Sequence, residues 1–177
     1  MSLKKIELKD LQLNPITTFL QDWPLLTAGN KTTGYNTMTI AWGHLGGIWG
    51  KPTLNVYIRP QRFTKTFVDE HEFFTVSVLP ANYKETLRYL GTVSGRMEDK
   101  INKADLTPMF DQAAPYFAEA KLVFICRKIY QVPILETGFL DTNLQNKVYP
   151  EKDFHDMYVG EIMDVLICSD STLSVTD

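Results

Sequence analysis

The sequence contains little cysteine and no long hydrophobic run. Cys126 and Cys168 are its two cysteines, and their separation forms neither a C-x-x-C redox motif nor a zinc-ligand set. We therefore expect both to be buried apolar thiols. No segment approaches the roughly 18 apolar residues that a membrane-spanning helix needs, and no apolar core follows the charged first residues as it would in a signal peptide. These absences predict a cytoplasmic protein with no membrane partner.

The sequence also has no excess of positive charge. Its 18 Lys and Arg residues are balanced by 21 Asp and Glu residues, which gives a net charge of −3. Nucleic-acid binding depends on cations that neutralise many phosphates at once, so no nucleic-acid partner is expected. A single phosphate group needs only one or two cations and a few backbone N–H groups, and a local site of that kind is compatible with this charge.

Familiar nucleotide-binding and catalytic motifs are missing as well. Glycines cluster at 43–50 without the G-x-G-x-x-G spacing, and we expect a loop between two strands there. There is no P-loop and no G-x-S-x-G nucleophile motif. The three histidines, His44, His71 and His155, are too far apart for a metal-binding helix, so no metal is expected. A site that the fold assembles from distant residues remains open.

The residues that are present indicate one mainly β domain over 1–177. The composition of 44% hydrophobic and 22% charged residues is typical of a globular protein, and no repeat or linker divides the chain. Short segments rich in β-branched and aromatic residues recur between turn residues. They predict six strands, at 25–29, 36–42, 53–59, 73–79, 121–130 and 158–167. Strands without regular helices between them favour a small barrel over a doubly wound sheet.

Two short helices are expected beside the strands. One runs from about 83 to 90, with Asn82 as its N-cap and Gly91 after its C-terminus. The other begins at Thr64, whose hydroxyl is expected to cap the first turn. In the strand at 53–59 apolar and polar residues alternate, which predicts one face in the core and one polar face.

One segment, 58–64, carries side chains that suit an anion. Arg59, Arg62 and Thr64 stand where a strand ends and a helix is expected to begin. Guanidinium groups match phosphate oxygens, and a helix N-terminus adds unpaired N–H groups and a favourable dipole. The alternative is that the arginines are solvated turn residues and that Thr64 is only a cap.

Two further segments, 36–43 and 91–100, suit a flat ring and an anion. In the first, hydroxyl and amide side chains accompany Met38 and Trp42, which fits the edge and the face of a heterocycle. A barrel strand with Met38 and Trp42 in the core is an equally good interpretation. In the second, a Ser-Gly pair allows close backbone approach to an anion, with Lys100 within reach. A plain connector is the alternative.

Four stretches, in this order along the chain, resemble the flavin reductase-like FMN-binding split-barrel family, which includes flavoredoxins and the small reductase components of two-component monooxygenases. The stretches are 36–43, 51–52 with 59–64, 93–96 with 99–100, and 155–162. The resemblance extends from about 25 to 167. It implies a six-stranded antiparallel split β-barrel of Greek-key type with short peripheral helices. It also implies a homodimer with FMN near the subunit interface.

The resemblance further implies which residues hold the cofactor. The residues expected along the flavin are Asn36, Thr37, Met38, Thr39 and Trp42. Those expected around its phosphate are Arg59, Arg62, Thr64, Ser94, Gly95 and Lys100. His155 is expected near the flavin, where as the one catalytic side chain it would tune or protonate the flavin or the acceptor. A surface histidine without such a role is the alternative.

For function, the resemblance implies an NAD(P)H-dependent flavin reductase that passes hydride through bound FMN to a flavin or another acceptor. NAD(P)H would dock transiently against the flavin, so the cofactor performs the chemistry and no dinucleotide fingerprint is needed. The alternatives are a non-enzymatic electron carrier of flavoredoxin type, and a split-barrel module that binds haem or another flat ligand. The stretch 141–153 is longer than the family's pattern, at a place where it would limit substrate access.

Overall fold

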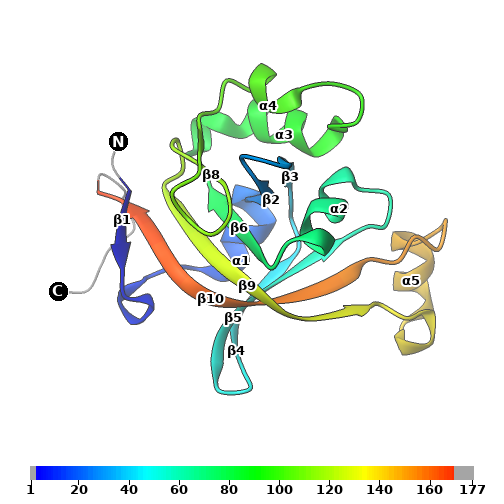
Figure 1. Ribbon diagram of the computed structural model, residues 1–177. Helices are drawn as coiled ribbons and strands as arrows, with labels where there is room; N and C mark the ends of the chain where they lie inside the picture. Colours follow the sequence, from blue (N-terminus) through cyan, green and yellow to red (C-terminus); the bar gives the residue numbers. More distant parts are fainter. Residues whose placement is uncertain (1–2, 170–177) are drawn as a thin grey trace.

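The computed structural model describes residues 3–169, which form one large antiparallel β-sheet with short helices around it (Figure 1). The strands of this sheet are β1 (Leu3–Ile6), β2 (Leu25–Asn30), β3 (Gly34–Thr39), β4 (Gly43–Ile48), β5 (Lys51–Ile58), β6 (Phe73–Val78), β9 (Leu122–Pro133) and β10 (Asp156–Cys168). They pair in the order β3-β2-β6-β9-β10-β5-β4, and β1 pairs with β10. A separate two-stranded sheet consists of β7 (Pro108–Met109) and β8 (Tyr116–Phe117).

The helices are short and lie around the sheet. They are α1 (Pro15–Thr17), α2 (Phe63–Glu70), α3 (Lys84–Thr92), α4 (Lys100–Lys103) and α5 (Thr142–Val148), with 3-10 turns at Leu8–Asp10, Ala81–Tyr83 and Glu136–Gly138 and a π-helical turn at Thr18–Asp22. Figure 1 shows α3 and α4 together at the top, α5 beside the far ends of β9 and β10, and the β4–β5 hairpin projecting from the bottom. The long strands β9 and β10 therefore connect the barrel to α5.

All six predicted strands are present, with ends that differ by a few residues, and β1 and β4 extend the sheet. The expectation of a loop at 43–50 is wrong. Its first six residues form β4, which pairs in register with β5 between Lys51 and Val56. Trp49 and Gly50 make the turn, with φ of 54° and 69°. Two left-handed residues are what a two-residue hairpin turn needs to match the twist of its strands.

The two helix predictions are confirmed in position but wrong in their caps. The helix expected at 83–90 is α3; it starts from the 3-10 turn Ala81–Tyr83, so Asn82 is no N-cap, and Gly91 lies inside the helix. The helix expected at Thr64 is α2, whose N-cap is Arg62 and has no side-chain cap bond. The Thr64 hydroxyl is engaged by another strand instead, as described below.

The core fills the inside of the sheet. Leu54, Val56 and Ile58 of β5 are fully buried there, which confirms the predicted alternation. Burial of a large apolar side chain stabilises a fold by about 1.5–3 kcal/mol, so each of these positions contributes substantially. Cys126 and Cys168 are both buried with free thiols, as expected, and burial raises the pKa of the Cys126 thiol.

Gly160 lets the long strand β10 bend across the core. A Cβ atom at this position would lie 2.5 Å from the ring of Phe74 and 2.8 Å from the Cβ of Cys126. The pairing of β10 with β9 shifts register between Val159 and Gly160, as at a β-bulge. Glycine at a bulge permits a tight bend and close packing. The bend carries the first residues of β10 toward α2 and the predicted site.

Candidate functional site

A cavity of about 230 Å³ lies where β3, the start of α2 and the loop after α3 meet. We call it the anion end. Its lining includes Asn36, Met38, Gln61, Arg62, Phe63, Thr64, Gly91, Ser94, Gly95 and Lys100. Seven of these are residues that the sequence singled out, and they come from all three ligand-binding segments. The fold therefore brings the three segments to one place.

The wall of the anion end is held by a contact between Asn36 and Thr64. Both side chains are buried, and the Asn36 Nδ2 donates a hydrogen bond of 2.9 Å to the Thr64 Oγ1. Gly95 packs directly against this pair, because a Cβ atom there would lie 2.5 Å from the Asn36 Oδ1. Only glycine fits this position without displacing Asn36. The backbone of 94–95 can thus approach whatever occupies the cavity.

Buried positive charge distinguishes the anion end. Lys100 is only 3% exposed, and its Nζ donates to the carbonyls of Leu90 at 2.8 Å and Val93 at 2.9 Å. Burial, and then the charge of Arg62, lower the pKa of Lys100 to about 8. Within residues 3–169, neither Lys100 nor Arg62 forms an ion pair with a carboxylate. A buried cation is costly unless an anion compensates it, so the cavity favours an anionic ligand.

The first turn of α2 adds to this preference. Arg62, Phe63 and Thr64 line the cavity at the N-terminal end of the helix. The N–H groups of a first helical turn have no partner within the helix, and the helix dipole places partial positive charge there. Arg62 also donates from Nη1 to the carbonyl of Gly91 at 3.3 Å, which orients its guanidinium group over the cavity wall.

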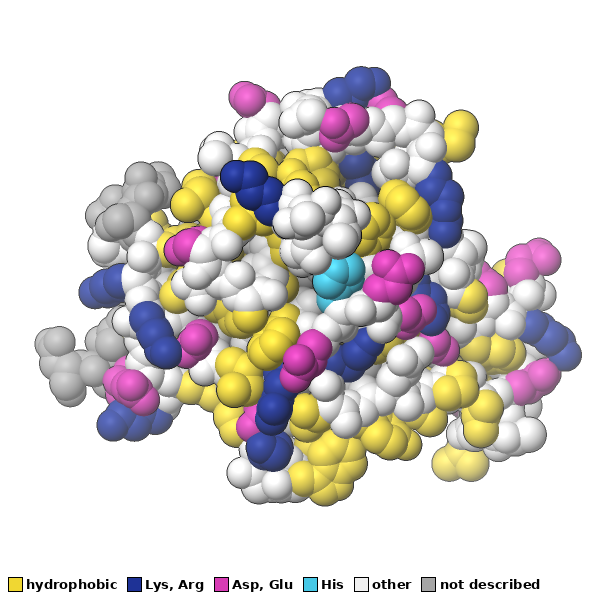
Figure 2. Space-filling model, in the orientation of Figure 1, with side chains coloured by type: hydrophobic (Ala, Val, Ile, Leu, Met, Phe, Trp, Pro, Cys, Tyr) yellow, Lys and Arg dark blue, Asp and Glu magenta, His cyan; other side chains and the backbone are white. Residues whose placement is uncertain are grey.

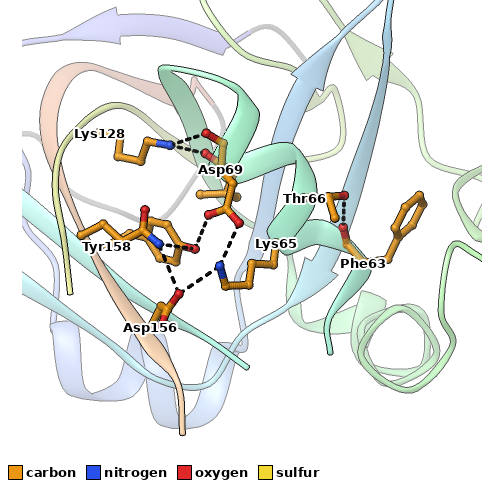
Figure 3. A network of polar contacts seen from close by, with 9 residues as sticks. Phe63, Lys65, Thr66, Asp69, Lys128, Asp156 and Tyr158 are labelled. Carbon is orange, nitrogen blue, oxygen red and sulfur yellow. Dashed lines mark hydrogen bonds and ion pairs between the residues drawn. The ribbon is translucent and has the colours of Figure 1, made fainter. Parts of the chain in front are cut away.

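Helix α2 is fixed from behind by a network of polar contacts (Figure 3). Lys65 forms ion pairs with Asp69 of its own helix at 2.8 Å and with Asp156 of β10 at 2.9 Å. The buried Tyr158 donates its hydroxyl hydrogen to Asp69 at 2.5 Å, and Lys128 of β9 donates to the carbonyls of Val68 and Asp69. The network uses the positive charge of Lys65, so this cation does not compete with Arg62 and Lys100 for an anion.

A second cavity of about 200 Å³ adjoins the first, and we call it the aromatic end. The two share Met38 and Arg62 in their walls. The other lining residues are Thr39, Ile40, Ala41, Trp42, Tyr57, Arg59 and His155. Together the two cavities form a trough that is cationic at one end and aromatic at the other.

His155 is buried at the aromatic end and is held by two rings. It is 9% exposed, its Nδ1 shares a hydrogen bond of 2.8 Å with the Tyr149 hydroxyl, and its ring centroid lies 4.6 Å from that of Trp42. Burial, and then the nearby charge of Arg59, lower the pKa of His155 to about 4. The imidazole is therefore neutral at pH 7 and can donate one hydrogen bond and accept another.

Arg59, expected at the phosphate, lies at the aromatic end instead. It forms an ion pair with Asp153, donates from Nη2 to the carbonyl of Val148 at 3.0 Å, and its guanidinium carbon lies 5.2 Å from the centroid of the Tyr149 ring. These partners all belong to the stretch that the sequence marked as unusually long. Its carboxylate neutralises Arg59, and the arginine in return holds α5 and the residues after it against the trough.

The alternation of β3 turns Thr37 and Thr39 away from the face that carries Asn36 and Met38 into the anion end. Thr37 lines neither cavity: it is fully buried, shares a hydrogen bond of 2.9 Å with Thr27, and donates to the carbonyl of Leu26 at 3.1 Å. Thr39 lines the aromatic end, although its hydroxyl donates to the carbonyl of Leu87 at 2.6 Å. Because its hydroxyl hydrogen is already used, Thr39 can bind a ligand only through its backbone groups or by accepting a hydrogen bond at its hydroxyl oxygen.

Sequence reasoning missed several residues that shape the site. Gln61 and Phe63 stand within a segment that was noticed for its arginines, but Tyr57, Tyr149 and Asp153 had no local motif. Among the residues that the structure describes, no group of three or more His, Cys, Asp or Glu side chains could hold a metal ion. No helix of this part of the chain is long and apolar enough to cross a membrane.

Comparison with known proteins adds a family and a set of similar folds. A family model described as flavin reductase like domain matches residues 18–175. A search of curated proteins gave no match. Among solved structures, an FMN-binding domain of a flavin reductases-like enzyme from Shewanella baltica OS155 has a TM-score of 0.66 at 15% identity, covering 94% of this chain and 77% of its own.

Two other solved structures are similar to the same extent. Flavoredoxin of Desulfovibrio vulgaris (Miyazaki F) has a TM-score of 0.65 at 23% identity, covering 88% of this chain and 75% of its own. An NADH:FAD oxidoreductase from Streptomyces globisporus C-1027, in complex with NAD and FAD fragments, has a TM-score of 0.62 at 15% identity, covering 83% of this chain and 74% of its own. The antiparallel sheet of this chain is a split β-barrel, and a similar solved structure from Shewanella frigidimarina NCIMB 400 is described as having a split barrel domain.

Proposed function

This chain belongs to the flavin reductase-like family, and from that premise we propose that it binds FMN in the trough and passes hydride from NAD(P)H through FMN to an acceptor. The S. baltica neighbour is described as FMN-binding, and the Streptomyces neighbour was solved with NAD and FAD fragments. These descriptions agree with the shape and charge of the trough, which offers cations at one end and aromatic walls at the other.

The observation that carries the proposal is the unpaired positive charge at the anion end, where Lys100 is buried and Arg62 is exposed at the cavity wall. Lys100 and Arg62 have no carboxylate partner among residues 3–169, so an anion there would stabilise them both. The phosphate of FMN is such an anion. We assign it to Arg62, Lys100, the first turn of α2 with Thr64, and the backbone of Ser94 and Gly95.

The aromatic end fits the flavin ring. Met38 and Trp42 provide apolar surface, and the chain from 38 to 42 supplies backbone polar groups for the edge of the ring. When bound, FMN supplies the hydride-accepting ring, so the protein needs no covalent nucleophile. What the residues of this chain contribute is position, exclusion of water and electrostatics.

His155 acts in this proposal as a neutral hydrogen-bonding group. Because its pKa lies near 4, it carries no charge at pH 7 and is a poor source of a proton as imidazolium. A neutral ring can still donate a hydrogen bond to an oxygen or nitrogen of the flavin or of the acceptor. The hydrogen bond to Tyr149 fixes which way the imidazole faces.

We further propose that the protein works as a homodimer. Ile48 and Trp49, at the tip of the β4–β5 hairpin, are exposed, and Trp49 contacts the exposed Tyr130 with ring centroids 5.6 Å apart. Figure 2 shows hydrophobic side chains gathered at the bottom of the molecule, where Figure 1 places this hairpin. Exposed apolar groups of this kind commonly mark a subunit interface. The mass of the purified protein in solution, measured by light scattering, tests the dimer.

The first experiment is an absorption spectrum of the purified protein after excess FMN has been added and the unbound fraction removed. Shifted flavin bands near one FMN per chain are expected, and their absence would reject the proposal. The similarity to a flavoredoxin favours one other candidate, an electron carrier that keeps FMN without reacting with pyridine nucleotide. Steady-state oxidation of NADH and NADPH separates the two, since a carrier would retain flavin but show no turnover.

A further inference from the structure

A third cavity of about 250 Å³ lies beside the aromatic end and shares Ala41, Trp42 and Tyr57 with it. We call it the side pocket. Besides Trp42 and Tyr57, its walls include Phe19, Leu20, His44 and Ile134. None of the proposed phosphate ligands reaches it. Because the two cavities meet at these three residues, a ring in one cavity can lie next to a ring in the other.

The floor of the side pocket is rigid and its mouth is open. Phe19 is buried in the main core, and its ring lies on the backbone of Gly43 so closely that any Cβ atom there would overlap it. At the mouth, Leu20 is 63% exposed and Trp42 is 40% exposed. A flat molecule could slide between these two side chains while one edge stays in water.

One polar pair lies among these apolar walls. The Tyr57 hydroxyl lies 3.1 Å from the Nδ1 of His44, and their rings meet edge to face with centroids 5.6 Å apart. Burial raises the pKa of Tyr57, so the hydroxyl keeps its proton at neutral pH. The hydroxyl hydrogen also reaches the Met157 Sδ, a weak acceptor, at 3.4 Å; when the His44 Nδ1 donates to the Tyr57 oxygen, that hydrogen can turn instead to a carbonyl oxygen, which is the stronger acceptor. The pocket thus combines apolar surface with a donor for one oxygen atom.

The residues that line the side pocket favour an uncharged ring over a nucleotide. No Lys or Arg is among the residues that line it in the described part of the chain, whereas the anion end is lined by the buried Lys100 and the exposed Arg62. A nucleotide acceptor would leave its phosphates without a partner here. An uncharged ring with carbonyl groups would leave nothing unpaired, because one carbonyl meets Tyr57 and a second can face water at the mouth.

From this arrangement we propose that the side pocket binds a small, uncharged quinone, and that this is the class of electron acceptor. The proposal rests on the proposed function for its source of electrons. Conversion of a quinone to a hydroquinone takes two electrons and two protons. When bound, reduced FMN would supply both electrons and one proton as hydride, and the second proton would come from water through His44 and the Tyr57 hydroxyl.

The test is calorimetric titration of the oxidised, FMN-loaded protein with 1,4-naphthoquinone, which measures binding without turnover. Leu20→Arg places a charged side chain in the mouth and should weaken quinone binding at least tenfold. The matched control is Ile16→Arg, because Ile16 is 68% exposed on the neighbouring helix and lines no part of the pocket. It should bind quinone as the original protein does, and both variants should retain FMN.

Other outcomes are equally informative. If the original protein binds no quinone, or if Leu20→Arg and Ile16→Arg bind it equally well, the proposal is overturned. If the original protein is a dimer that binds no quinone, and Leu20→Arg separates this dimer into monomers, a second copy of the chain covers the pocket. That result also overturns the quinone proposal. Loss of FMN binding by the original protein would reject the proposed function instead, and titration of the FMN-free protein with the same quinone would still show whether the pocket binds it.

Discussion

The hydroxyl of Tyr149 and the Nδ1 of His155 share a hydrogen bond of 2.8 Å, and the guanidinium carbon of Arg59 lies 5.2 Å from the centroid of the same tyrosine ring. Because Tyr149 is the C-cap residue of α5, the position of this helix determines where its hydroxyl holds the His155 ring at the aromatic end. Because burial and the charge of Arg59 both disfavour a charged imidazole, His155 stays neutral in the folded protein to a pH well below its usual titration. This relationship leads to the first prediction.

Stability should fall in acid because of His155. Its pKa is about 4 when folded against 6.5 when unfolded, so the unfolded state binds the proton first as pH decreases. Its contribution is thus complete above pH 6.5 and is lost progressively down to about pH 4. We expect a loss on the order of 2 kcal/mol. Urea unfolding of the original protein and His155→Gln at several pH values checks this, and parallel pH curves for the two would contradict it.

The phosphate of FMN should be bound through Arg62 and Thr64. Their joint replacement, Arg62→Ala with Thr64→Ala, should weaken FMN far more than riboflavin, which has no phosphate. Charge-assisted hydrogen bonds are worth about 1.5–3 kcal/mol each, so roughly tenfold or more is expected per contact. Fluorescence titration with both flavins measures it. Arg88→Ala is the matched control, because Arg88 is exposed on α3 and pairs with Glu85. Equal losses for FMN and riboflavin would place the phosphate elsewhere.

The affinity for FMN should decrease in alkali through Lys100. Its pKa is lowered to about 8, so above that pH the side chain loses the charge that attracts phosphate. Between pH 7 and pH 9 we expect FMN affinity to fall by roughly tenfold while riboflavin affinity stays constant. Lys100→Met should bind FMN weakly at both pH values and lose this dependence. A dependence that persists in the variant would assign the titration to another group.

Gly95 should tolerate no side chain. In Gly95→Ala the new methyl group would meet the Asn36 Oδ1 and break the bond between Asn36 and Thr64. We expect FMN affinity to fall by about tenfold or more and the melting temperature to decrease by several degrees. Gly138→Ala is the matched control, since nothing lies within 4 Å of a Cβ atom there. If both variants behave alike, the close packing of 95 against Asn36 is not important for binding.

The strands of this fold could be predicted because their signal is local. The alternation at Leu54, Val56 and Ile58 reports burial directly, and β-branched residues mark the other strands. The strand β4 could not be predicted in this way. Its glycines carry no strand preference, and it exists because its backbone pairs with β5, a contact between segments that sequence periodicity does not record.

The site was predictable only where its residues lie close together in the sequence. Asn36, Arg62 and Lys100 stand in recognisable segments, and the fold brings them to one cavity. The place of Arg59 depends on Asp153, which lies far along the chain and approaches only because β10 returns beside β5. Thr37 differs for another reason: β3 carries polar side chains on both faces, Asn36 on one and Thr37 on the other, and the sequence does not reveal which face will meet a ligand.

The ion pair between Lys65 and Asp156 has a consequence for ligand length. Lys65 belongs to the helix that begins at the anion end, and Asp156 directly follows His155 at the aromatic end. The ion pair therefore holds the anion end and the aromatic end of the trough at a fixed distance from each other. A ligand binds at both ends only if the distance between its charged group and its ring matches the distance between the two cavities. A shorter or longer ligand with the same charged group and the same ring should bind poorly.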